Sequence, residues 1–195
     1  MTHIFAFRLR PLVRVGALIL ISACLFAAAG RAEAAENADE AKVKLLVLDL
    51  ELIGDLGGPE LERTHAERLR EVSQQLRSEL AQSSGYEIID ATPAAEMIER
   101  LRGTQYLHKC NGCEIDIALE LDADQVMVAW IHRVSQLILS LTYEIREVPS
   151  GRALRRKSFD FRGDNDTGWS RAVSYMVRDI EAAFPEGRSP QRSVP

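Results

Sequence analysis

The spacing of apolar residues predicts two strands and three helices in the segment 42–121. Residues 42–52 are nearly continuously apolar from Leu45 to Leu50, which is typical of a strand covered on both faces. Further along, apolar residues recur at helical spacing in three segments, and a short apolar run separates the first two of them. In chain order, these predicted elements are a helix over 60–82, a strand over 86–90, and helices over 93–101 and 114–121.

Two of these predicted helices have a clear apolar side. In the helix over 114–121, Ile115, Ala118 and Leu119 should face the core. In the helix over 60–82, the side opposite the apolar residues is charged and should be a solvated surface. That charged side consists of Glu62, Arg63, Glu67, Arg68, Arg70 and Glu71.

The period of the pattern changes to two in the last third of the chain, which predicts antiparallel strands. Residues 125–133 and 136–148 both alternate, and the turn Pro149-Ser150-Gly151 leads to a partner strand over 152–161. A final helix over 168–184 follows. Its inward side is predicted to contain Trp169, Ala172, Val173, Met176, Val177 and Ile180.

These elements occur in the order β-α-β-α-α-β-β-β-α. An early βαβ unit followed by an antiparallel meander predicts an α+β fold, in which helices pack on a mixed sheet. Residues 42–184 are enough for a single domain that buries its own core. Polar residues flank this domain, and the segments 35–41 and 185–195 are expected to be disordered.

Residues 1–34 have the pattern of a secretory signal peptide. Arginines near the N-terminus precede an apolar stretch from Val15 to Ala29, and small residues around Glu33 predict cleavage after Ala34. The apolar stretch is short for a permanent membrane span, so none is expected after cleavage. An alternative is a lipid anchor at Cys24, although the residues after Cys24 remain apolar where a mature lipoprotein usually becomes polar. We therefore expect a periplasmic protein.

The charge of the expected mature segment, 35–195, indicates its class of partner. The leader contains four of the 24 Lys and Arg and one of the 29 Asp and Glu, so that 20 basic residues remain against 28 acidic residues. A net charge of about −8 gives no general attraction to nucleic acid, and we expect no nucleic-acid partner.

Cys110 and Cys113 are the only cysteines outside the leader. In an exported protein, two thiols at this spacing are expected to form a disulfide with each other. A redox-active pair is the alternative, because Cys113 precedes a predicted helix whose dipole would lower the pKa of its thiol. Glu114 and Asp116 oppose this effect by placing negative charge at the same helix start. A metal site at the pair would need further ligands, and no metal or cofactor is expected.

The remaining polar residues predict no catalytic set. His65 and His132 are interpreted as residues at the boundary of the core, and Asp49 as a satisfied polar group at a strand end. The segment 164–168, Asp-Asn-Asp-Thr-Gly, begins like a calcium loop, but Tyr175 stands where the closing glutamate should be. A turn in which Asp166 or Thr167 caps the last helix is the preferred interpretation. No nucleophile elbow, phosphate loop or dinucleotide fingerprint is present, which lowers the probability of an enzyme.

Three stretches resemble an uncharacterised bacterial family of secreted proteins, a domain of unknown function (2380/3280 type). The resemblance covers about residues 42–182, and the family carries no established activity. The three stretches are Leu45–Leu52, Cys110-Asn111-Gly112-Cys113 leading to Ala123-Asp124, and Trp130–Arg146 continuing to Gly163–Trp169.

The element order is more distantly similar to periplasmic domains of the curli secretion channel, the N-terminal module of the Tol-system β-propeller protein, and lipoprotein activators of cell-wall synthases. This resemblance implies contact with another protein in the cell envelope rather than catalysis. We therefore interpret the chain as a non-enzymatic accessory module for an envelope protein.

The predicted contact surface of this module is either the Ile138-Ser140-Thr142 face or the edge of the hairpin 136–161, through strand addition. A thiol–disulfide protein that uses Cys110 and Cys113 is the alternative function. No individual residue of the sequence supports the binding of a small ligand between helices and sheet.

Overall fold

The computed structural model describes residues 42–82 and 85–183. The predicted signal peptide over 1–34 with Cys24, the lead-in over 35–41 and the tail over 185–195 lie outside the described residues, as does Phe184 at the end of the predicted domain.

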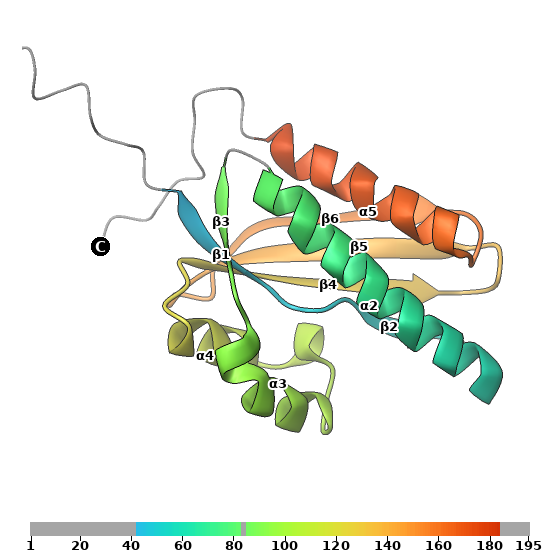
Figure 1. The fold of residues 1–195 in the computed structure, drawn as a ribbon, viewed down its shortest axis with the longest axis horizontal. Coiled ribbons are helices and arrows are strands. Elements are labelled where there is room, and N and C mark those ends of the chain that lie inside the picture. The colour runs from blue at the N-terminus through green and yellow to red at the C-terminus, as the bar shows by residue number, and fades with distance from the viewer. Residues whose placement is uncertain (1–41, 83–84, 184–195) are drawn as a thin grey trace, which may run out of the picture. The chain divides into compact units, whose positions relative to one another are not determined.

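Most predicted elements are present, with ends that differ by at most three residues, and two 3-10 turns (η) are added. In chain order, with the labels of Figure 1, the elements are β1 (Val43–Val47), β2 (Glu51–Gly54), α2 (Pro59–Gln82), β3 (Tyr86–Ile89), η2 (Thr92–Ala94), α3 (Ala95–Arg102), η3 (Leu107–Lys109), α4 (Cys113–Glu120), β4 (Gln125–Arg133), β5 (Leu139–Glu147), β6 (Ala153–Phe161) and α5 (Asp166–Glu181).

The strands form one mixed sheet with the order β3-β1-β4-β5-β6, to which β2 is added on β4. The N-terminal strands β1 and β2 and the short β3 run parallel to their neighbours, whereas β5 and β6 are antiparallel. The predicted α+β class with a mixed sheet is therefore confirmed.

The predicted first strand, 42–52, is wrong in one respect, because it is interrupted. Both of its pieces pair with β4, but the chain between them leaves the ladder. There the backbone N–H of Leu50 donates to Ser73 Oγ on α2 at 2.9 Å. Asp49 accepts hydrogen bonds from Arg77 and Arg102 at 2.7 and 3.1 Å, so its interpretation as a satisfied strand-end group is confirmed. These side-chain partners stabilise the break.

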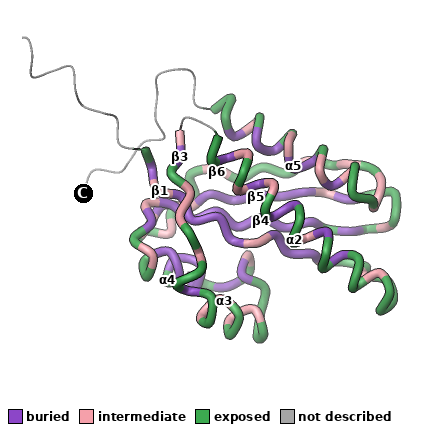
Figure 2. The backbone as a smooth tube through the Cα atoms, in the orientation of Figure 1, coloured by how far each residue is buried: buried purple, intermediate pink, exposed green. Residues whose placement is uncertain are grey.

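Helices cover the two faces of the sheet (Figure 1). Helices α2 and α5 pack together on one face, and α3 and α4 lie on the other. Figure 2 shows the central strands buried along most of their length, as two covered faces require. In β4 the alternate residues Met127, Ala129 and Ile131 join the core under α2 and α5, whereas Val126, Val128 and Trp130 join the core over α4.

The predicted inward side is confirmed for α5 but only in part for α4. All six residues predicted to face inward on α5 are buried, which confirms that pattern. On α4, however, Leu119 is 51% exposed and Ile117 is fully buried in its place. The cap of α5 is also corrected: Asn165, and neither Asp166 nor Thr167, accepts the capping hydrogen bond, from the Gly168 N–H at 2.9 Å.

Candidate functional site

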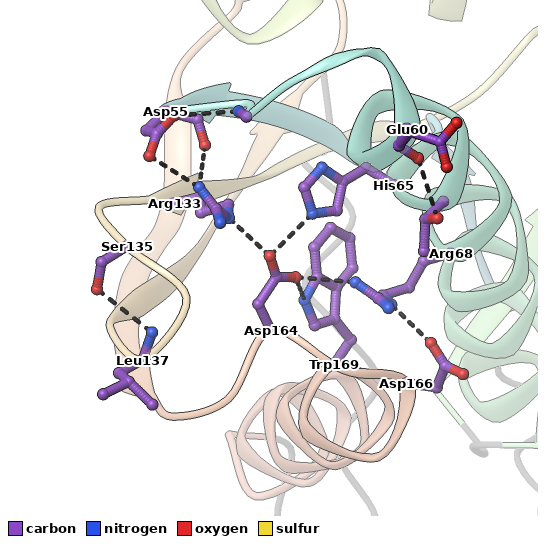
Figure 3. A network of polar contacts seen from close by, with 12 residues as sticks. Asp55, Glu60, His65, Arg68, Arg133, Ser135, Leu137, Asp164, Asp166 and Trp169 are labelled. Atoms are coloured by element: carbon purple, nitrogen blue, oxygen red, sulfur yellow. Dashed lines mark hydrogen bonds and ion pairs between the residues drawn. The ribbon is translucent and has the colours of Figure 1, made fainter.

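A buried carboxylate, Asp164, lies in the loop between β6 and α5 and accepts hydrogen bonds from four side chains (Figure 3). Two of the donors are guanidinium groups: Arg133 Nε at 2.6 Å, from the end of β4, and Arg68 Nη1 at 2.8 Å, from α2. The other two are the His65 ring, whose Nε2 lies 2.9 Å away, and the Trp169 Nε1 at 3.2 Å. Three segments far apart in the chain therefore meet at the two carboxylate oxygens of Asp164.

Each arginine of this Asp164 cluster also has a second carboxylate partner. Two outer carboxylates complete the pairing: Asp55 lies 3.0 Å from Arg133 Nη1, and Asp166 lies 2.7 Å from Arg68 Nε. Burial alone would raise the pKa of Asp164, but the hydrogen bonds from Arg133 and His65 outweigh it and hold this pKa below its usual value. Asp164 is therefore an ionised structural anchor.

The local sequence explains how the cluster forms. His65 and Arg68 are one helical turn apart on α2, so they point to the same side. The His65 ring stacks on Trp169 with centroids 5.8 Å apart, and the Arg68 guanidinium lies 5.2 Å from the centroid of the same indole. Gly163, at φ 89°, allows the turn that places Asp164 over the start of α5.

Two predictions are wrong at this cluster. The pattern predicts Arg68 on the solvated side of α2 and His65 at the boundary of the core, but they are only 8% and 2% exposed. Both positions fall within the apolar stripe of α2, which was the available signal. The first carboxylate of the calcium-like segment, Asp164, is paired with two arginines. His132, in contrast, is exposed at the end of β4, as expected of a boundary residue.

The cluster supports the tip of the β4–β5 hairpin, residues 134–138, which we call the apolar tip. Its three large apolar side chains are mostly exposed: Val134 54%, Leu137 67% and Ile138 52%. The backbone beneath them is fixed, because Ser135 Oγ accepts from the N–H groups of Leu137 and Ile138. The tip is also bound to the cluster, since the Asp164 N–H donates to the Gln136 carbonyl at 2.9 Å. Figure 3 shows Ser135 and Leu137 beside Arg133.

The predicted Ile138-Ser140-Thr142 contact face is therefore not present as such. Ile138 is exposed, but Thr142 is buried, and its hydroxyl donates to Ser158 Oγ on β6 at 2.9 Å. The other predicted surface is present as an edge: β6 pairs with β5 along one side and has no strand on its other side among residues 42–82 and 85–183.

The sulfur atoms of Cys110 and Cys113 lie within bonding distance, and their Cα atoms are 5.6 Å apart. Both residues are buried, at 7% and 8% exposure, and Gln105 Nε2 lies 3.1 Å from the Cys110 sulfur. A Glu114 oxygen lies within 4.8 Å of the two sulfurs, but Glu114 also accepts from Arg146 at 2.9 Å. A metal ion could use this trio only after reduction of the pair.

Sequence reasoning missed Glu51, a buried carboxylate in β2. It accepts backbone hydrogen bonds from Leu107 and His108 at 2.7 and 3.0 Å, and its other contact is His108 Nδ1 at 2.5 Å. The His108 ring also stacks on Trp130, with centroids 4.4 Å apart. Glu51 therefore attaches turn η3, and with it the cysteine pair, to the sheet. Its position within an apolar strand gave no indication of this role.

A known protein family matches most of this chain. The family model DUF3280, described as protein of unknown function (DUF2380), matches residues 43–180, which confirms the resemblance drawn from three stretches. None of the curated protein sequences matches the chain.

Several solved structures are similar to the chain at low sequence identity. The LpoB C-terminal domain from Escherichia coli is 16% identical, with 60% of this chain and 81% of that chain covered and a TM-score of 0.44. The PelC dodecamer from Paraburkholderia phytofirmans is 11% identical, with 77% and 90% covered and a TM-score of 0.46. TolB from Acinetobacter baumannii is 10% identical, with 73% and 28% covered and a TM-score of 0.43. At these identities and TM-scores the likeness carries no conclusion about function.

Proposed function

Because the chain belongs to the DUF3280 family, whose function is unknown, we propose its role from its own residues: it is an exported, periplasmic accessory module that binds another protein of the cell envelope. We assign the contact to the apolar tip, residues 134–138. The observation that carries this proposal is the exposure of Val134, Leu137 and Ile138, each by more than half, on a loop with a fixed backbone.

The geometry of the apolar tip suits protein binding. Apolar side chains at the end of a hairpin can enter a pocket of a partner, where a few such anchors supply most of the binding free energy. Because the Ser135 and Gln136 hydrogen bonds already hold the loop, little conformational entropy is lost on binding. The Asp164 cluster, in this proposal, keeps the tip in its binding conformation.

Two observations support a module that is not an enzyme. Asp164, the most buried carboxylate of the cluster, accepts four hydrogen bonds and is held ionised by its arginine partners, so it is poorly placed to accept a proton. The cysteine pair is buried beside the hydrogen-bonded turn η3, which restricts thiol exchange.

Export is supported by the pattern of residues 1–34. Of the helices in the described part of the chain, none is both long and apolar enough for a bilayer.

Site-specific photo-crosslinking in the native cells tests the proposal. A photo-reactive phenylalanine analogue is placed at position 137, at position 158 on the free edge of β6, and at position 71 on the solvent side of α2 as the matched control. We expect one defined adduct from position 137 and none from position 71. The Leu137→Asp variant, supplied in excess without the label, should not reduce the adduct, whereas the unlabelled wild type should.

An adduct from position 158 without one from 137 would refute the tip and support strand addition at β6. Equal labelling from all three positions, or none from any of them, would refute a defined docking surface on this face. Glu71 and Ser158 are both exposed, so a difference among the positions cannot result from burial of the probe.

A further inference from the structure

A cavity of about 360 Å³ opens beside β2. It exists because β2 pairs with β4 on one side and has no strand on its other side within the described residues, since β3 extends only beside β1. Helix α2 and the segment before turn η3, from opposite faces of the sheet, therefore meet across this open edge with space between them.

The walls of the cavity are largely apolar. Leu52 of β2, Leu56 after it and Leu69 of α2 line it, and Ala66 and Tyr106 stand at its exposed side. By comparison with the cavity of roughly 150 Å³ that holds a benzene ring, the space suits a molecule of on the order of a dozen non-hydrogen atoms. The volume also lies within the range of small-molecule sites.

The three most buried polar side chains of the lining all make polar contacts outside the cavity. The Glu51 carboxylate is bonded to turn η3, and Arg102 Nη1 is bonded to Asp49. His65 differs from both, because its Nε2 contacts Asp164 while its Nδ1 is buried without a hydrogen-bond partner. Figure 3 shows the second ring nitrogen of His65 on the side away from Asp164.

The chemistry of His65 fixes what it can offer to a ligand. Asp164 is an ionised carboxylate that can only accept, so Nε2 carries the proton of that hydrogen bond. A neutral ring with a proton on Nε2 presents Nδ1 as an acceptor. Leaving this buried acceptor unsatisfied costs free energy that a ligand donor would recover.

We propose that this cavity binds a small, largely apolar molecule with one hydroxyl or N–H donor, which donates to His65 Nδ1. The apolar body lies against Leu52, Leu56 and Leu69, and the donor reaches the ring between them. This site is separate from the apolar tip, so failure of either proposal leaves the other standing.

The test uses 4-propylphenol as the probe and the purified protein. Binding is followed by titration in ¹H–¹⁵N correlation spectra, in which amides of residues 52–56 and 62–69 should shift in a saturable way. The methyl ether of the same molecule, 4-propylanisole, keeps the apolar body but has no donor. We expect it to bind at least five times more weakly.

Two matched variants locate the site. Ala66→Phe places a ring at the mouth of the cavity and should weaken phenol binding at least tenfold. Ala81→Phe makes the same change at an exposed position near the end of α2, away from the cavity, and should leave binding unchanged. Both variants change the same residue type on the same helix, and the thermal midpoint of each confirms folding.

The results that would overturn the proposal are specific. Equal affinity of 4-propylphenol and 4-propylanisole would show that the ligand donates no hydrogen bond to His65 Nδ1. Equal affinity of the Ala66→Phe variant and the wild type, or saturable shifts confined to residues outside 52–56 and 62–69, would remove the cavity. Absence of saturable shifts up to millimolar 4-propylphenol would refute the site altogether.

Discussion

At the scale of single residues, Asp164 and Asp166 can be compared directly, because both bind Arg68 but one is buried and the other is exposed. Asp164 is 4% exposed and Asp166 is 79% exposed, and both contact Arg68. Asp164→Asn leaves Arg68 and Arg133 buried without their shared anion, so we expect a loss of about 3–5 kcal/mol in the free energy of unfolding. Asp166→Asn should cost less than about 1 kcal/mol. Urea unfolding of the two variants measures both, and similar losses would contradict a buried ionic anchor.

The sequence predicted the turn that contains Asp164 but could not predict its partners. A cap at the start of the last helix follows from residues that are neighbours in the chain, and only the choice of Asn165 over Asp166 depended on the local backbone. The partners His65 and Arg68 lie almost one hundred positions away. Charged residues within an apolar stripe are usually interpreted as solvated, because their burial requires a counter-ion that the helix pattern does not show.

At the scale of elements, the cysteine pair joins turn η3 to the start of α4, and we predict that it is a structural disulfide. Replacing both cysteines by serine should lower the free energy of unfolding by about 1–3 kcal/mol, because the loop that they close is very short. The reduction potential should lie below about −300 mV, as for a structural bond. Unfolding in urea and equilibration with a dithiol buffer measure the two quantities. A clearly more oxidising pair with a low thiol pKa would instead support the redox alternative.

Helix α4 shows why the inward side of a short helix is difficult to predict. In this sequence Ile115, Ala118 and Leu119 form one regular stripe, and Cys113, Ile117 and Ala118 form another. The structure buries the whole second stripe and Ile115 of the first, since Cys113 lies against Cys110 and the neighbouring Glu114 is bonded to Arg146 on β5. These contacts set the rotation of the helix and leave Leu119 exposed. The longer helix α5 had one possible stripe, and its prediction was confirmed.

At the scale of the folded domain, local periodicity determined the fold class, whereas the break in the first strand and the cavity depend on contacts between distant segments. The predicted order and the mixed sheet follow from periods of 3.6 and 2 that each segment shows by itself. The break at 48–50 follows from Ser73 and Arg77 on α2, which no pattern in the strand reveals. The cavity could not be predicted either, because it lies at the edge of β2 that stays unpaired where β3 extends only beside β1.

Acid pH should destabilise the whole domain through its ion pairs. Burial raises the pKa of Asp179, but hydrogen bonds from Lys157, Arg155 and Tyr143 outweigh it, so that this pKa, like that of Asp164, lies below its unfolded value of about 3.8. Near that pH the unfolded chain binds more protons than the native one, so stability is full above about pH 5 and falls as the pH decreases through the native values.

Urea unfolding between pH 8 and pH 3 tests this acid dependence. We expect the free energy of unfolding to be nearly constant down to about pH 5 and then to fall. In the Asp179→Asn variant one of the two carboxylates no longer titrates, so its stability should be lower at pH 7 and should fall less steeply below pH 5. Arg155 and Lys157 are partly exposed, which allows this variant to fold. An equally steep acid slope in the variant and the wild type would show that the ion pairs of Asp179 do not contribute.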